Sequence, residues 1–174
     1  MSWTPWHDQL HRRLLQQPDL LPSGSRLLLA VSGGQDSMAL CALLTQLVPL
    51  HHWDLTLWHG DHGWHPDSSR FAAELSDWAR GQELAIRIER AVPDAVASEA
   101  AARRWRYACL MEQASTEQRD VVTGHTATDR AETLLLQMAR GTDLAGLGSL
   151  RPLRPLSADA PDGPWLRRPL LSFS

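Results

Sequence analysis

The sequence contains no lysine, so arginine carries all of its fixed positive side-chain charge. A Walker-type phosphate loop needs a lysine in the pattern Gly-x-x-x-x-Gly-Lys-Ser/Thr, and this class of nucleotide site is therefore excluded. Any phosphate must be bound by backbone N–H groups, Mg²⁺ and arginine. The formal net charge of −3 excludes a surface that is basic throughout, but it allows a local basic patch for nucleic acid.

Cysteine is nearly absent as well. The two cysteines, Cys41 and Cys109, cannot build an iron–sulfur or zinc site of the C-x-x-C type. Each has apolar neighbours in a predicted helix, so we expect buried free thiols and a cytoplasmic setting. No apolar run reaches the roughly 18–20 residues of a membrane span, and the first residues do not resemble a signal peptide. These absences favour a single globular domain without membrane segments.

The most informative stretch spans residues 27–47, where two apolar runs enclose the sequence Ser-Gly-Gly-Gln-Asp-Ser. The first run, 27–31, is short and apolar on both faces, which is typical of a buried parallel strand. The second run, 38–47, lacks glycine and is typical of a helix. A strand that turns into a helix presents unpaired N–H groups at a positive dipole end, so the turn predicts an anion site.

This turn resembles the pyrophosphate-binding loop, Ser-Gly-Gly-x-Asp-Ser, of the N-type ATP pyrophosphatases, or PP-loop superfamily. The resemblance implies ATP binding with cleavage between the α- and β-phosphates. Asp36 lies among anion donors, where it would be repelled unless it holds Mg²⁺ or orients a reacting group. The alternative is a glycine-containing turn that binds nothing. The residues assigned to ATP here are Ser32, Gly33, Gly34, Gln35, Asp36 and Ser37.

Strand and helix patterns alternate along the rest of the chain. Further strands are predicted at 54–59, 84–89 and 120–123, and further helices at 67–80, 96–114 and 129–139. The alternation predicts a doubly wound α/β fold with a mainly parallel, five-stranded sheet and helices on both faces, similar to Rossmann folds and adenine nucleotide alpha hydrolases. The polar turns at 32–37, 60–65 and 124–128 all follow strands, so we expect them on one rim, where such sheets bind ligands.

The two ends of the sequence differ from this middle part. Residues 1–25 are expected to form a helix and a linker packed on the main domain, 26–174, because Trp6, Leu10 and Leu14 recur every fourth residue. Beyond Gly141 the sequence is rich in proline and locally basic. We interpret this as a domain whose continuation, a tRNA-recognition region, was either lost or left out.

Four stretches together resemble the tRNA(Ile)-lysidine synthetase family: residues 31–40, 59–74, 99–107 and 124–147, followed by Arg-Pro-Leu-Leu at 168–171. The resemblance covers residues 26–171. It implies that ATP and L-lysine convert the wobble cytidine of an isoleucine tRNA with a CAU anticodon into lysidine. The cytidine would first be adenylated, and AMP and pyrophosphate would be released.

The fourth stretch also departs from its family. The family motif is His-His-x-Asp-Asp-Gln-Ala-Glu-Thr, and here the second His, the first Asp and the Gln are replaced, whereas His125, Asp129 and Glu132 remain. The retained residues are catalytic candidates, together with Asp36 and Arg103. The alternative is that Thr128 or Asp129 merely caps a helix. The carboxylate that recognises or deprotonates lysine stays open among Asp36, Asp61, Asp129 and Glu132.

Two arginines and one histidine complete the predicted ATP site. Arg103 and Arg106 share a helix face with Glu99, so they either clamp phosphates or form a solvated ion pair with that glutamate. His59 is assigned to the ATP site, in a turn that contributes to adenosine or lysine binding, since a metal site at His59 and His62 lacks helical ligand spacing. The proposed tRNA contacts are Arg103, Arg106, Arg151, Arg154, Arg167 and Arg168.

Two other functions remain open at this point. One is another PP-loop enzyme, either a tRNA thiolase, which usually uses C-x-x-C pairs that are absent here, or an amide synthetase. The other is a nucleotide-binding module that no longer catalyses. The sequence says nothing about the oligomeric state.

Overall fold

The computed structural model describes residues 3–129, 131–132 and 150–173, and these residues form a six-stranded sheet in the order β3-β2-β1-β4-β6-β5. All neighbouring pairs are parallel except β5 with β6. The prediction of a mainly parallel sheet is confirmed, but the predicted number of five strands was one too low. The strands are β1 Arg26–Ala30, β2 Asp54–Asp61, β3 Ala85–Arg90, β4 Asp120–Thr123, β5 Leu153–Pro155 and β6 Trp165–Arg167.

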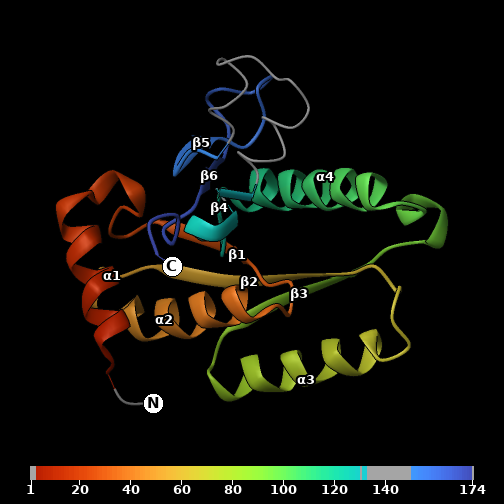
Figure 1. Ribbon diagram of the computed structural model, residues 1–174, viewed down its shortest axis with the longest axis horizontal. Helices are drawn as coiled ribbons and strands as arrows, with labels where there is room; N and C mark the ends of the chain where they lie inside the picture. The colour runs from red at the N-terminus through yellow and green to blue at the C-terminus, as the bar shows by residue number, and fades with distance from the viewer. Residues whose placement is uncertain (1–2, 130, 133–149, 174) are drawn as a thin grey trace.

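Helices cover both faces of the sheet, as predicted for a doubly wound fold (Figure 1). One face carries α1 (Pro5–Gln16), α2 (Gln35–His51) and α3 (Ser68–Gly81), and the other carries α4 (Glu99–Glu117). Two short 3₁₀ helices, η1 (Pro18–Leu20) and η2 (Pro93–Val96), lie in the connections. Within the described part of the chain, no helix is long and apolar enough to cross a membrane.

The alternation of side chains along β1 explains why its sequence is apolar throughout. Leu27 and Leu29 belong to the core beneath α1, α2 and α3, whereas Leu28 belongs to the core beneath α4. Successive side chains of a strand point to opposite faces, and both faces are covered here. The continuous apolar run therefore marks a central strand.

Several helix ends differ from the predicted ones. α2 continues through Pro49 to His51, and α3 ends at Gly81, one residue beyond the predicted range 67–80. α4 begins at Glu99 because the Ser98 hydroxyl accepts the N–H of Ala101, so the predicted helix start at 96 was three residues early. The predicted helix 129–139 lies largely outside the described residues, although 127–129 and 131–132 are helical.

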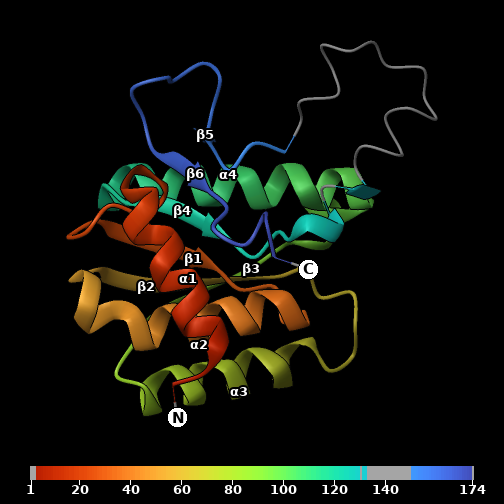
Figure 2. The ribbon, with the colours of Figure 1, turned by 60° about the vertical axis from the view of Figure 1, so that its left-hand side comes forward.

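The C-terminal segment packs into the domain. Arg167 is buried and pairs with Asp120 at 2.6 Å, and Arg168 donates to the Arg151 carbonyl oxygen at 2.9 Å while being 1% exposed. The prediction that Arg167 and Arg168 contact tRNA directly was therefore wrong, because both are inaccessible. Phe173 joins the core beside α1, and its ring centre lies 6.1 Å from that of Trp6, so the C-terminal segment packs against α1 (Figure 2).

Candidate functional site

A polar cavity with a volume of about 360 Å³ lies at the carboxyl ends of the strands. It lies where β1 and β4 are neighbours, which is the point at which the strand order reverses and where doubly wound sheets bind ligands. Its size is within the usual range for small-molecule sites, about 300–1,000 Å³. Nine predicted site residues line it: Ser32, Gly34, Gln35, Asp36, Ser37, Arg103, Arg106, His125 and Asp129.

Two serines stabilise the loop between β1 and α2. The hydroxyl of Ser37 accepts the N–H of Ser32 at 3.2 Å and donates to the carbonyl oxygen of Gly34 at 2.8 Å. The two serine hydroxyl oxygens lie 3.1 Å apart. α2 starts after Gly34, which offers no side-chain cap, so the N–H groups of the first turn have no acceptor within the helix. This geometry suits a phosphate group.

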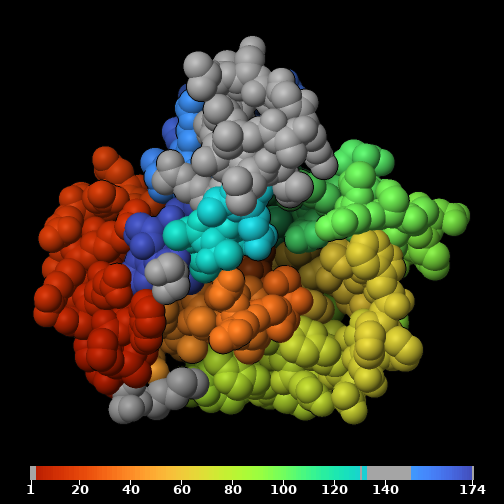
Figure 3. Space-filling view, viewed as in Figure 1, coloured from red at the N-terminus to blue at the C-terminus, as the bar shows by residue number. Residues whose placement is uncertain are grey.

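The loop after β4 approaches the start of α2 closely (Figure 3). A Cβ atom at Gly124 would lie 2.9 Å from the Cα of Ser37 and 3.0 Å from the carbonyl oxygen of Asp36. Both are backbone atoms, so neither can rotate away. Gly124 was not predicted as a site residue, although a glycine directly after a strand, opposite a glycine loop, is a signal for such an approach.

Positive charge gathers on the α4 side of the cavity. The Nε atoms of Arg106 and Arg168 are buried and have no hydrogen-bond partner among the described residues. Burial lowers the pKa of both side chains, which nevertheless stay cationic at neutral pH. The guanidinium of Arg103 lies 5.2 Å from the centre of the Tyr107 ring. Arg168 does not line the cavity, so Arg103 and Arg106 form this wall, and their guanidinium groups suit an anionic ligand.

Two histidines at the cavity are held in their neutral form. Burial lowers the pKa of His125, and the charge of Arg168 lowers it further, although Asp129 raises it. The His125 Nδ1 atom lies 2.8 Å from the Thr123 hydroxyl oxygen. Burial also lowers the pKa of His62, whose Nε2 atom has no partner among the described residues. Both rings can therefore exchange hydrogen bonds with a ligand without adding charge.

Asp129 has a structural contact as well as a place in the cavity. Its Oδ2 atom accepts the N–H of Thr126 at 2.7 Å and lies 3.1 Å from the Thr126 hydroxyl oxygen. The helical turn begins at Ala127, so Thr126 is the capping residue. The alternative that Thr128 or Asp129 starts this helix misplaced its first residue, but Asp129 does contribute to the cap, through its contact with the Thr126 N–H. Glu132 is exposed and does not line the cavity.

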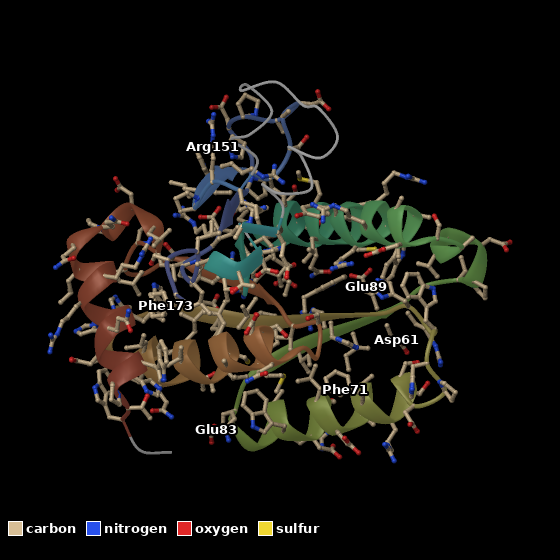
Figure 4. The ribbon with its side chains drawn as sticks, in the orientation of Figure 1. Asp61, Phe71, Glu83, Glu89, Arg151 and Phe173 are labelled. Carbon is tan, nitrogen blue, oxygen red and sulfur yellow. The ribbon has the colours of Figure 1, made fainter. Side chains whose placement is uncertain are left out.

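His59 lies outside this cavity. Its Nδ1 atom is 2.7 Å from the carbonyl oxygen of Val31, and its side chain contributes to a neighbouring cavity of about 310 Å³. Asp61 belongs to that second cavity too, at the end of β2 (Figure 4), and accepts the N–H of Gly63 at 2.8 Å. Arg90 lies 3.4 Å from the same carboxylate. The Asp61 carboxylate is thus already bound by the Gly63 N–H and the Arg90 side chain.

Among the described residues, no group of three or more His, Cys, Asp or Glu side chains could hold a metal ion. Mg²⁺ binds nucleotide phosphates through only one or two protein carboxylates, so one exposed carboxylate in a phosphate site is sufficient. Asp36, exposed in the first turn of α2 and lining the cavity, fits this role.

The other lining residues come from β1, β2, α4, β4 and the loops that follow the strands. Gly60, His62 and Gly124 lie in the polar turns that were predicted on this rim, but the others were not predicted to line a site. Trp58 and Leu110 are apolar and look like ordinary core residues. Their place in the cavity depends on the packing of α4 over β2. The additional lining residues are Ala30, Val31, Trp58, Gly60, His62, Tyr107, Leu110, Thr123 and Gly124.

Comparison with known proteins gives close relatives. The chain is 63% identical over 174 residues to a tRNA(Ile)-lysidine synthase of Parasynechococcus marenigrum (strain WH8102), covering all of this chain and 52% of that protein. It is 51% identical over 173 residues to a tRNA(Ile)-lysidine synthase of Synechococcus sp. (strain ATCC 27144 / PCC 6301 / SAUG 1402/1), covering 99% and 51%. The chain thus spans about half the length of the curated relatives it matches.

A solved structure supports the fold. The U34-tRNA thiolase NcsA from Methanococcus maripaludis with its [4Fe-4S] cluster superposes with a TM-score of 0.76 at 16% identity, covering 96% of this chain and 60% of that chain. The pattern of the PP-loop domain matches residues 7–174, which include the glycine loop, the arginine wall and the His125 segment. This chain therefore belongs to the PP-loop domain family.

Proposed function

We propose that this chain carries the ATP-dependent activity of a tRNA(Ile)-lysidine synthase, which joins L-lysine to the wobble cytidine of an isoleucine tRNA with a CAU anticodon. The observation that carries the proposal is one cavity lined both by the uncapped start of α2 and by Arg106, whose buried Nε atom has no hydrogen-bond partner among the described residues. The high identity to proteins of that name supports the choice of reaction.

The first step is attack of the cytidine C2 oxygen on the α-phosphate of ATP, with pyrophosphate as the leaving group. Ser32, Ser37 and the N–H groups of the first α2 turn would bind the departing pyrophosphate. Arg103 and Arg106 would stabilise the negative charge that develops during transfer. Asp36 would hold Mg²⁺, which would offset phosphate charge. The chain's own contribution is positioning and charge stabilisation.

The second step is attack of the lysine amine on the adenylated carbon, with AMP as the leaving group. A carboxylate must recognise the ammonium group or accept its proton. Asp129 lines the cavity, and Thr126 orients its carboxylate, so we assign this role to Asp129 ahead of Asp61 and Glu132. His125, neutral at this site, would hydrogen-bond the cytidine or the phosphate.

The rival PP-loop functions have less support in these residues. A thiolase would require reactive sulfur, but burial raises the pKa of both Cys41 and Cys109 to about 12, and neither lines the cavity. Both thiols are free, which agrees with the cytoplasmic setting that we propose. The proposed substrate there is a tRNA. A catalytically inert module remains a distinct outcome of the experiment below.

The deciding experiment is transfer of labelled lysine to an isoleucine tRNA with a CAU anticodon, with AMP and ADP both measured. We expect one AMP per lysine incorporated, with loss of both products in Asp36→Asn. Asp77→Asn is the control, because Asp77 is exposed and pairs with Arg80 on α3. AMP without incorporation would restrict the chain to adenylation, and an absence of ATP turnover would reject the proposal.

A further inference from the structure

Two side chains from other elements enclose the start of the loop at residues 32–37. Gly33 has a φ of +85°, and a Cβ atom there would lie 2.7 Å from Cζ and 2.8 Å from Cε1 of Phe71. The Phe71 ring therefore occupies the space in which a side chain at position 33 would lie. Figure 4 shows Phe71 on α3, the helix nearest to this edge of β2 and β3.

His59, on β2, contacts both the loop and that ring. Its Nδ1 atom lies 2.7 Å from the carbonyl oxygen of Val31, and since a carbonyl only accepts, Nδ1 must carry the proton. The rings of His59 and Phe71 meet edge to face, with their centres 5.3 Å apart. Val31, His59, Phe71 and Gly33 thus form one closed set of contacts around the first turn of the loop.

We propose that Phe71 and His59 are positioning residues that hold this loop in the conformation that binds the phosphates of ATP. The inference rests on the proposed function, because it assumes that the loop binds ATP. Two adjacent glycines give the loop many accessible conformations, and ordering them opposes ligand binding. The ring against Gly33 and the hydrogen bond to Val31 remove that freedom before the ligand arrives. His59 acts through the loop, not through contact with the nucleotide.

The first test needs no nucleotide. We expect Phe71→Leu to speed hydrogen exchange of the Ser32 and Gly34 amides, which bond to serine hydroxyls of the loop, by at least about tenfold, since a lost contact of about 1.4 kcal/mol changes an opening equilibrium by that factor. Trp78→Leu is the matched control, because Trp78 is also a partly buried aromatic residue of α3 that packs on the same core. Equal exchange of the loop in the wild type and in Phe71→Leu would overturn the proposal.

The second test separates positioning from nucleotide contact. Asn at position 59 keeps an N–H near the place of Nδ1, whereas Ala removes it. We expect His59→Ala to weaken ATP binding about tenfold and His59→Asn to restore most of that loss, with the larger change in KM than in kcat. If Asn is as weak as Ala, the hydrogen bond to Val31 does not hold the loop, and that role of His59 is wrong.

The two tests fail in distinguishable ways. If the wild-type chain does not bind ATP, the proposed function fails, yet hydrogen exchange in Phe71→Leu still decides whether the ring holds the loop. If the wild type binds ATP and both Phe71→Leu and His59→Ala bind it equally well, the proposed function stands and the positioning inference fails.

Discussion

Buried arginines occur at both edges of the sheet, but their partners differ. At the amino edge, Arg119 lies 3.0 Å from the Asp54 carboxylate and 2.7 Å from the Glu117 carboxylate. At the carboxyl edge, Arg106 and Arg168 each keep a buried Nε atom without a partner among the described residues. A buried guanidinium N–H without a partner is unfavourable, and of these two arginines only Arg106 lines the cavity. The comparison separates Arg119, which stabilises the fold, from Arg106, which we propose serves an anionic ligand.

The largest expected effect concerns Arg106, at the carboxyl edge of the sheet. Arg106→Met should slow AMP formation by about 100- to 1,000-fold, the usual result of removing one group that stabilises transition-state charge. It should leave the free energy of unfolding unchanged or slightly higher, because a desolvated cation is removed. Single-turnover assays and urea unfolding measure the two effects. Arg104→Met, an exposed neighbour on the same helix, should change neither.

Arg119→Met should show the opposite behaviour. Removing one partner of a buried ion pair costs about 3–5 kcal/mol, but Asp54 is 53% exposed and Glu117 is 17% exposed, so we expect roughly 2–3 kcal/mol. ATP binding by the folded protein should not change, since Arg119 lies at the other edge of the sheet. Urea unfolding with an ATP titration checks both points. A stable variant that has lost ATP binding would contradict the comparison.

A third substitution probes the backbone contact at the carboxyl edge. Gly124→Ala places a Cβ atom about 3 Å from backbone atoms of the first α2 turn, so the helix start must shift. We expect ATP affinity to fall at least about tenfold. Gly81→Ala is the control, because no atom lies within 4 Å of its added Cβ and alanine favours a helix. Isothermal titration with ATP measures the difference, and equal affinities would show that the two segments are not in close contact.

Acid should selectively weaken the ion pairs of Arg119 at the amino edge. The hydrogen bond from Arg119 lowers the pKa of Asp54; burial raises the pKa of Glu117, but hydrogen bonds from Arg119, Arg87 and Gln113 lower it by more. A lowered carboxyl pKa stabilises the fold above the unfolded value, about 4, and this stabilisation is lost as the pH falls through the folded pKa. Between pH 5.5 and 3, Arg119→Met should therefore lose less stability than the wild type. If the stability of both proteins falls equally with pH, Arg119 does not stabilise these two carboxylates.

The smallest effect belongs to an exposed pair at the same edge. Arg26 lies 3.1 Å from Asp54, but the two side chains are 46% and 53% exposed. Exposed ion pairs contribute about 0–1 kcal/mol, so Arg26→Ala should change the free energy of unfolding by no more than about 0.5 kcal/mol. Urea unfolding at low salt measures it. A loss as large as that of Arg119→Met would mean that burial is not what separates the two arginines.

Much of the fold could be predicted because its signals are local. The apolar run before the glycine loop, the alternation of strands and helices, and the polar turns after strands all follow from neighbouring residues. β5 and β6 were not located because each has only three residues, too few to show an alternation, and β5 includes Pro155. Arg167 and Arg168 were misplaced because a proline-rich basic stretch is usually exposed, whereas here Asp120 and the Arg151 carbonyl oxygen accept hydrogen bonds from these two arginines.

The sequence alone determined the PP-loop character of this protein, since Ser-Gly-Gly-Gln-Asp-Ser between a strand and a helix, in a chain without lysine, permits few other phosphate sites. Only the tertiary structure decided which polar residues share the cavity. Arg106 and His125 both line it because β1 and β4 are neighbours and α4 packs over them. His59 instead donates a hydrogen bond to the Val31 carbonyl oxygen, outside this cavity. Contacts between distant segments depend on strand order and packing, which local patterns do not encode.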